Sequence, residues 1–441
     1  MLFEDAGWWR HYPLALTRPV FELRVGVTSL GRRLLAQMAA RKYTRAVLLC
    51  REYLASVTRR AFPALSVNEL PVDGELLFLN GGTLFFKGEL ERLLKQLETT
   101  PVLHSGGRLV AARLPATEGR RLLKWLALGL DAVGGVPGCP RELRGQPTKE
   151  PVRFIDRPWD LVHQNEPTLM DDFSITSSGF MRGGGLAGKG QASALPTVAP
   201  GAHLVKKNRI LARPGARVMT GAVLDASSGP IILGENARIM PNAVVMGPAY
   251  IGPNSLIKIG AKIYGGTSIG PVCKVGGEVE GSILHGYANK QHEGFLGHSY
   301  LGEWTNLGAG TDTSDLKNNY GTVRVWTEEG LIDSGQRFVG LCMGDHSKCG
   351  IGTMFNTGTM VGVSANVFGA GYPPKQIPSY SWGGAAGLEG YALEKALAVA
   401  GVVMGRRNRP FEAADEAVLR HVYLVTERHR QGLPAARGGS E

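Results

Sequence analysis

In the second half of the chain, aliphatic residues recur at every sixth position. Eight of them follow one another at this spacing: Leu233, Ile239, Val245, Ile251, Ile257, Ile263, Ile269 and Val275. An amphipathic helix requires a period of about 3.6 residues and a lone strand a period of two. A period of six fits a triangular solenoid, in which each coil has three short sides and each side places one aliphatic residue inside. Stacked coils then bury a continuous apolar column. The spacing therefore predicts a parallel β-helix.

The first 150 residues follow a different pattern, in which short apolar runs alternate with helical periodicity. Strands are predicted at 21–25, 45–50 and 75–79, and helices at 30–40, 88–97 and 118–130. Strands that alternate with helices are typical of an α/β domain with a mainly parallel sheet.

These patterns and the composition of the chain predict four parts. They are an α/β domain over 1–150, a connecting segment with a Gly-rich linker over 151–204, a β-helix over 205–383 and a helical cap over 384–441. Two helices are expected in the cap, at 388–404 and 411–429. The Gly-rich linker includes the sequence G-x-x-x-x-G-K at 183–189, but Gly190 stands where a phosphate-binding loop has Ser or Thr. The repeat breaks at 277–294 and at 311–340, and such insertions form loops, often on the binding face.

The composition excludes several classes of protein. The 441 residues are 43% hydrophobic and 20% charged, which excludes wholesale disorder. The net charge of +11 favours anionic partners, but no nucleic-acid motif accompanies it. No apolar run reaches the roughly 18 residues of a membrane span, and no signal region follows Met1. We therefore expect a cytoplasmic protein with no membrane or nucleic-acid partner. The five scattered cysteines predict buried free thiols.

One stretch of the β-helix carries a more specific resemblance. His292 is followed fourteen residues later by Asn306, which opens the motif Asn-Leu-Gly-Ala-Gly-Thr. This stretch resembles the acetyltransferase half of the bifunctional N-acetylglucosamine-1-phosphate uridylyltransferase/glucosamine-1-phosphate acetyltransferases, which are left-handed β-helix enzymes. The resemblance implies that His292 is the catalytic base and that Asn306 contacts the substrate. Phe295 stands where the family usually has Tyr. His298 is the alternative base, and Phe295, His298 and Tyr300 are further expected substrate contacts.

The same resemblance implies the other components of the reaction. Acetyl-CoA would be the cosubstrate, an amino-sugar phosphate the acceptor, and a homotrimer the assembly. The expected substrate contacts in the inserted loop are Lys317, Asn318 and Asn319, and the expected coenzyme contacts are Gly369 and Lys375.

The N-terminal segment 13–26 resembles a divergent branch of the sugar nucleotidyltransferases. The resemblance implies nucleotide binding by residues of this segment and of the third strand: Thr17, Arg18, Glu22, Arg24 and Asn80. The family's Gly-rich loop is missing, and the sequence Asn-Gly-Gly at 80–82 stands where the family has an Asp that binds Mg²⁺. A phosphoryl-transfer site without that carboxylate lacks its main charge neutraliser, so Mg²⁺ is expected only if this domain is active.

There are two alternative functions, a non-catalytic binding protein and a zinc hydratase, and the histidine spacing argues against the second. The chain could be a non-catalytic sensor or scaffold that binds nucleotide sugars. A zinc hydratase would need three histidine ligands, and the spacing of His285, His292 and His298 does not match the close pair of that family. No metal ligand set is therefore predicted.

Overall fold

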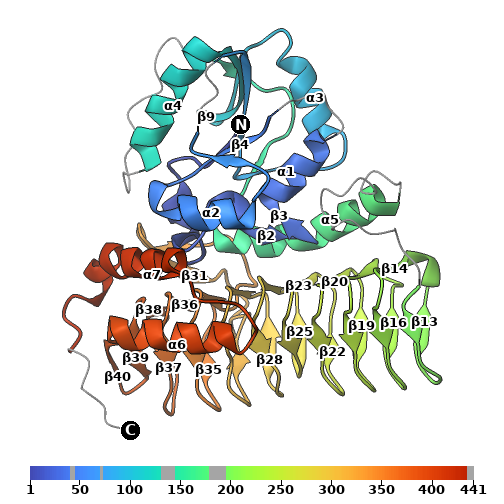
Figure 1. Cartoon of the computed structure of the whole chain (residues 1–441). Helices are drawn as coiled ribbons and strands as arrows, with labels where there is room; N and C mark the ends of the chain where they lie inside the picture. Colours follow the sequence, from blue (N-terminus) through green and yellow to red (C-terminus); the bar gives the residue numbers. More distant parts are fainter. Residues whose placement is uncertain (40–44, 70–72, 131–144, 178–194, 435–441) are drawn as a thin grey trace. The chain divides into compact units, whose positions relative to one another are not determined.

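The computed structural model describes residues 1–39, 45–69, 73–130, 145–177 and 195–434 (Figure 1). The chain forms two compact units. The N-terminal unit comprises residues 1–11, 17–23 and 28–157. The β-helix unit comprises residues 12–16, 24–27 and 158–441.

A seven-stranded mixed sheet forms the centre of the N-terminal unit. Its strand order is β10-β8-β9-β6-β1-β4-β5. The strands are β1 (Leu2–Phe3), β4 (Val47–Leu49), β5 (Ser66–Val67), β6 (Glu75–Asn80), β8 (Val102–Ser105), β9 (Arg108–Pro115) and β10 (Gln146–Pro147). Strand β1 lies parallel to both β4 and β6, and β9 is antiparallel to β6 and β8. The connection from β5 to β6 crosses β1, so the strand order reverses there. In open α/β sheets such a reversal places ligands at the carboxyl ends of the strands.

Four helices accompany this sheet: α1 (Leu30–Met38), α2 (Ala55–Ala61), α3 (Glu89–Gln96) and α4 (Ala116–Leu130). Three of them confirm predicted helices, and β4 and β6 confirm predicted strands. The strand predicted at 21–25 is wrong in its first half, because Val20–Glu22 forms a 3-10 turn directly after Pro19. Only β2 (Arg24–Val25) is extended there. The remaining short strands of the first part of the chain are β3 (Thr28–Ser29), β7 (Thr83–Leu84) and β11 (Arg153–Phe154).

Three faces of short parallel strands build the β-helix unit, and together they form the predicted left-handed β-helix. The first face comprises β12 (Thr197–Val198), β15 (Arg217–Val218), β18 (Arg238–Ile239), β21 (Leu256–Ile257), β24 (Lys274–Val275) and β27 (Asn289–Lys290). The second comprises β13 (His203–Val205), β16 (Val223–Asp225), β19 (Val244–Met246), β22 (Lys262–Ile263), β25 (Glu278–Glu280) and β28 (Phe295–Gly297). The third comprises β14 (Ile210–Ala212), β17 (Ile231–Leu233), β20 (Ala249–Ile251), β23 (Thr267–Ile269), β26 (Ile283–Leu284), β29 (Tyr300–Leu301), β33 (Cys342–Met343), β36 (Met360–Val361) and β38 (Gln376–Ile377).

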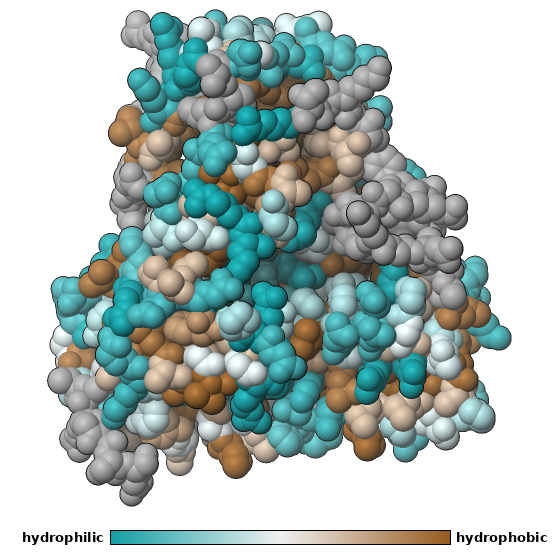
Figure 2. Space-filling model, in the orientation of Figure 1, coloured by the Kyte–Doolittle hydropathy of each residue, from teal (hydrophilic) through white to brown (hydrophobic). Residues whose placement is uncertain are grey.

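The predicted column of aliphatic residues is the core of this solenoid. All eight residues from Leu233 to Val275 are buried, and they belong to one apolar cluster that continues to Ile377. On the face of the molecule shown in Figure 2, by contrast, apolar residues form small separate groups among hydrophilic ones. The period of six is therefore explained by burial inside the coils. Four of the five cysteines lie in the described residues, and all four are buried free thiols, as predicted.

The last coils continue the parallel pairing with β30 (Asp312–Thr313), β34 (Lys348–Cys349), β35 (Met354–Phe355) and β37 (Asn366–Val367). The period of six did not reveal the hairpin of β31 (Arg324–Thr327) and β32 (Gly330–Asp333) or the antiparallel pair of β39 (Ser381–Gly384) and β40 (Gly387–Gly390). The helices of this unit are α5 (Pro158–Ser177), α6 (Leu393–Gly405) and α7 (Ala413–Val425). The predicted helix at 388–404 begins too early, because Leu388 pairs with Gly383 in the antiparallel β39–β40 pair. The Gly-rich segment 178–194, including the sequence at 183–189, lies outside the described residues.

Candidate functional site

His298 directly follows β28, in the turn that connects β28 to β29. Its backbone has φ of +40°, which bulky side chains rarely adopt. The peptide is held there from both sides, since His298 N–H donates to Glu280 O (3.0 Å) and its carbonyl accepts from Gly340 N–H (3.0 Å). Strained residues of this kind persist only where the surroundings fix them, and they cluster at functional sites.

Asp315, in the segment that leads into the insertion, orients the His298 imidazole. Nδ1 of His298 lies 2.8 Å from Oδ2 of Asp315, and only 22% and 12% of the two side chains is exposed. A carboxylate accepts hydrogen bonds, so Nδ1 donates, and in the neutral ring Nε2 carries the free lone pair. Gly281 lies beside Nε2: a Cβ at that position would come within 3.0 Å of it. The imidazole is thus arranged as a general base with a fixed tautomer.

The close approach of Asp315 depends on Gly297. A Cβ at Gly297 would lie 2.2 Å from Oδ2 of Asp315 and 2.5 Å from the ring of Phe295. The predicted residue Phe295 therefore lies next to the histidine–aspartate pair.

His163 of α5 and Phe338 of the insertion pack on the same imidazole. The His163 and His298 rings stack at 6.2 Å between centroids, and the Phe338 ring lies 4.9 Å from His298. A ring nitrogen of His163 bonds to Phe338 O at 3.0 Å. Burial, followed by the neighbouring His298, lowers the pKa of His163. The lowered pKa favours the neutral form of His163, which adds no positive charge next to the His298 ring.

Two predicted lysines contact the backbone of the insertion. Nζ of Lys317 donates to Thr322 O at 3.3 Å, and Nζ of Lys375 donates to Arg324 O at 3.1 Å. Burial lowers the pKa of Lys375, and the charge of Lys317 lowers it further. The two cations thus lie within electrostatic reach of each other. Leu316, which precedes Lys317, bridges to Phe338, so this positive region adjoins the histidine pair.

The other predicted residues of the β-helix unit lie in varied surroundings. His292 is exposed in a turn, where its carbonyl accepts from Lys290 Nζ at 2.6 Å. Asn306 joins a ladder in which its Oδ1 accepts from Asn289 at 3.4 Å. Asn318 and Asn319 are exposed, and Gly369 lies in an exposed turn with φ of +100°.

Tyr300 and Arg24, predicted for different sites, lie together in the β-helix unit. The Tyr300 hydroxyl is buried, accepts from Arg24 N–H at 2.8 Å and lies 2.9 Å from Nδ1 of His285. The Arg24 guanidinium donates to His285 O at 2.9 Å. Both side chains are thus engaged in contacts within the unit.

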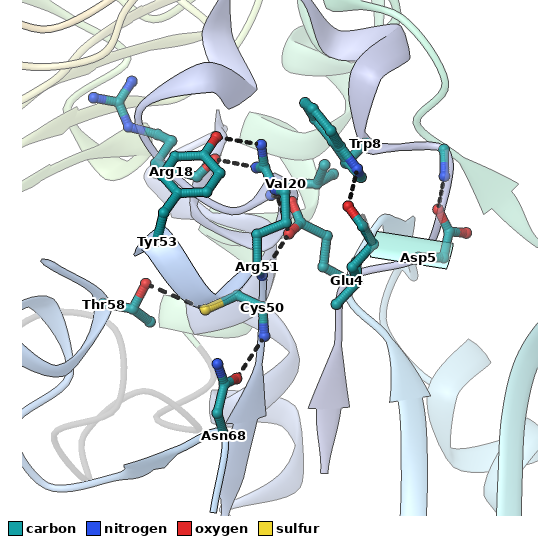
Figure 3. Close-up of polar contacts among 12 residues, drawn as sticks. Glu4, Asp5, Trp8, Arg18, Val20, Cys50, Arg51, Tyr53, Thr58 and Asn68 are labelled. Carbon is teal, nitrogen blue, oxygen red and sulfur yellow. Dashed lines mark hydrogen bonds and ion pairs between the residues drawn. The ribbon is translucent and has the colours of Figure 1, made fainter. Parts of the chain in front are cut away.

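A second polar site lies in the N-terminal unit, at the carboxyl end of β1. Glu4 and Arg51 form a bidentate ion pair, in which Nε of Arg51 donates to Oε2 of Glu4 at 3.0 Å and Nη2 donates to Oε1 at 2.9 Å. Figure 3 shows the Arg51 side chain between Glu4 and Tyr53. The carbonyl of the predicted residue Arg18 accepts from the same guanidinium at 3.1 Å. Thr17 and Glu22 are half-buried nearby in the sequence.

Asn80, predicted as a nucleotide contact, is buried beside Asp5. Its amide nitrogen donates to Oδ2 of Asp5 at 2.8 Å, and its oxygen accepts from Gly82 N–H at 2.9 Å. Arg108 donates to the same Asp5 oxygen at 2.8 Å and also to Asp156. Although burial alone would raise the pKa of Asp5, Arg108 and the surrounding donors hold it below its usual value.

These contacts do not fit the Mg²⁺ ion that nucleotidyl transfer implies. Asn80 presents its NH₂ group to Asp5, and both carboxylates are already bound to Arg108. Within the described residues, no group of three or more His, Cys, Asp or Glu side chains is arranged to hold a metal ion.

Sequence reasoning missed the partners of both sites. Asp315 lies two residues before the predicted contact Lys317 but was not itself predicted as a site residue. His163 and Phe338 are remote from His298 in the sequence. Asp5 stands two residues after the apolar pair Leu2 and Phe3, a position where strand ends carry ligands. That position was a usable signal.

Comparisons with known families agree with the two units. Residues 1–180 match the family described as Sugar nucleotidyl transferase, and residues 230–265 match Bacterial transferase hexapeptide (six repeats). The chain carries a sugar nucleotidyl transferase family domain followed by hexapeptide repeats. The resemblance predicted from the sequence is confirmed at this level. A comparison with curated proteins found no match.

Solved structures similar to this hexapeptide-repeat chain include acyltransferases. A variant of GDP-perosamine N-acetyl transferase from Caulobacter crescentus, in complex with CoA and GDP-perosamine, is 14% identical, covers 38% of this chain and 51% of its own, and has a TM-score of 0.15. The Arabidopsis UDP-N-acetylglucosamine acyltransferase is 14% identical, with coverages of 48% and 78% and a TM-score of 0.20. The Campylobacter jejuni UDP-N-acetylglucosamine acyltransferase is 14% identical, with coverages of 55% and 98% and a TM-score of 0.18.

No helix in the described parts of the chain combines the length and the apolar character needed to cross a membrane.

Proposed function

We propose that the β-helix unit transfers an acetyl group from acetyl-CoA to the amino group of a sugar phosphate, with His298 as the general base. The observation that carries this proposal is the 2.8 Å contact between His298 Nδ1 and Asp315, which leaves Nε2 as the proton acceptor. The hexapeptide transferase match of this unit supports a group-transfer reaction.

In the proposed reaction the sugar nitrogen attacks the thioester carbonyl carbon. Nε2 of His298 takes the proton that the nitrogen loses as the C–N bond forms. The C–S bond breaks, and the coenzyme leaves as a thiolate that takes up a proton. Asp315 stabilises the imidazolium that forms on His298 and keeps the ring in its orientation. Asp315 is therefore a positioning residue.

The lysine pair is the proposed partner of the acceptor's phosphate. Lys317 and Lys375 lie close enough for one charge to lower the pKa of the other, and a phosphate between them would relieve that repulsion. We propose glucosamine-1-phosphate as the acceptor and a homotrimer as the assembly, both from the sequence resemblance. Light scattering of the purified chain tests the assembly. We do not extend the proposal to nucleotidyl transfer, because Arg108 occupies the carboxylates of the N-terminal unit.

The test is a thiol-release assay with acetyl-CoA and glucosamine-1-phosphate. His298→Ala should lower kcat/KM by ~10²-fold or more. His292→Ala is the matched control, because His292 is exposed, and its variant should stay within about threefold of the wild type. Asp315→Asn should lower kcat and shift the pH profile while KM changes little.

Two outcomes would overturn the assignment. A loss in the His292 variant larger than that in the His298 variant would return the base to His292. No thiol release with any amino-sugar phosphate would favour the alternative function, a non-catalytic nucleotide-sugar sensor.

A further inference from the structure

Two aspartates in the N-terminal unit share one guanidinium. Asp5 follows β1, Asp156 follows β11, and Arg108 begins β9. One terminal nitrogen of Arg108 donates to Oδ2 of Asp5 at 2.8 Å, and the other donates to Oδ1 of Asp156. The guanidinium therefore lies between the two carboxylates and compensates both.

The surroundings fix this arrangement. The Arg108 guanidinium packs over the Phe154 ring at 4.0 Å. Asp5 also accepts from Gly7 N–H at 2.9 Å, and Arg10 lies 3.9 Å from Asp156. The side chains of Asp5, Asp156 and Arg108 remain 21%, 38% and 26% exposed. Water can therefore reach the cluster.

The cluster lies where this type of sheet binds charged ligands. Phe3 of β1 pairs with Asn80 of β6 at the reversal of strand order, and Asp5 bonds to Asn80 there. A hard divalent cation such as Mg²⁺ binds one or two carboxylates plus water at about 2.1 Å. Two partly exposed carboxylates bound to one guanidinium are such a ligand set once the guanidinium is removed.

The neighbouring acid is unavailable for the same reason. Glu4 is fully buried and bound by Arg51 through both oxygens. Each carboxylate directly after β1 thus has its own arginine, and a divalent ion would have to displace a guanidinium to bind.

We propose that Arg108 is a built-in replacement for a divalent cation, and that removing its charge opens a Mg²⁺- or Mn²⁺-binding site formed by Asp5 and Asp156. This proposal is independent of acyl transfer by the β-helix unit. It assigns the N-terminal unit a carboxylate site that is closed to divalent metals in the wild type.

The experiment measures Mn²⁺ binding to the full chain by calorimetry and electron paramagnetic resonance. Arg108→Gln should gain one Mn²⁺ per chain with a Kd below about 1 mM, and Mn²⁺ should raise its Tm. The double variant Arg108→Gln/Asp5→Asn should lose the gain. Arg113→Gln is the matched control, because Arg113 is on the same strand and pairs with the exposed Glu75 at 3.7 Å.

A second measurement, on the wild type, does not depend on whether the Arg108→Gln variant folds. The wild type and Asp5→Asn should show the same weak background of Mn²⁺ binding. A stoichiometric Mn²⁺ site in the wild type that Asp5→Asn removes would overturn the proposal. A folded Arg108→Gln chain that gains no Mn²⁺ would overturn it as well.

Discussion

The buried ion pair between Glu4 and Arg51 makes a strong prediction about the stability of the N-terminal unit. The side chains are 0% and 2% exposed. Glu4 Oε1 also accepts from Val20 N–H at 2.8 Å, and the Arg51 guanidinium lies 3.9 Å from the Trp8 ring centroid. Glu4→Gln keeps the shape and an acceptor for Val20 but removes the negative charge. Arg51, which is buried, then loses the counter-charge that Glu4 supplies.

The expected cost follows from that uncompensated charge. Removing one partner of a buried pair costs about 3–5 kcal/mol. For a domain of this size, 1 kcal/mol shifts Tm by about 2–4 °C, so the transition of the N-terminal unit should fall by roughly 6–20 °C. The double replacement Glu4→Leu/Arg51→Met removes both charges and should recover most of the loss, because well-packed apolar pairs often match a buried ion pair.

Differential scanning calorimetry of the full chain measures both effects. Glu150→Gln is the control, because Glu150 pairs with Arg92 at 2.8 Å while the Arg92 side chain is 54% exposed. That surface pair should contribute at most about 1 kcal/mol. The reasoning is refuted if Glu4→Gln shifts the transition no more than Glu150→Gln does, or if the double variant is less stable than Glu4→Gln.

Two further predictions concern the β-helix unit. Gly297→Ala should reduce acetyl transfer by ~10–100-fold, because its Cβ would displace Asp315 from His298; thiol release measures this, and an unchanged kcat would contradict it. Burial lowers the pKa of Lys290 from 10.5 to about 8, so unfolding takes up a proton between about pH 8 and 10, and stability rises with pH across that window. Lys290→Met should make the rise shallower in urea unfolding from pH 7.5 to 10, and an identical slope would argue against this assignment.

The fold of the β-helix could be predicted because its cause is local and repeated. The eight aliphatic residues from Leu233 to Val275 occupy equivalent places on successive sides of the coils, so one spacing encodes the whole core. The additions do not repeat. The hairpin β31–β32 and helix α5 each occur once, and the Leu388 strand interrupts what composition alone suggests is a helix. Only tertiary pairing with Gly383 decides that segment.

The candidate site was less predictable, because its members are joined by folding rather than by spacing. His298 and Asp315 are separated by seventeen positions, and His163 comes from a helix more than a hundred residues earlier. The sequence resemblance places the base at His292, because the fourteen-residue spacing from His292 to Asn306 matches that of the family. Of the two candidate bases, His298 has a carboxylate partner, Asp315 at 2.8 Å, whereas His292 is exposed. The proposed base catalysis relies on that partner.

The N-terminal unit illustrates the converse. In the sequence, Asn80 stands where the family has a metal-binding Asp. In the structure, Oδ2 of Asp5 lies 2.8 Å from the amide nitrogen of Asn80, so a carboxylate is present at this place. What differs from a metal-dependent site is therefore the counter-charge rather than the acid. Arg108 cannot lose its proton near neutral pH, so it neutralises Asp5 and Asp156 at all physiological metal concentrations. In the proposed arrangement, Arg108 supplies at the end of β1 the positive charge that a divalent ion would otherwise supply.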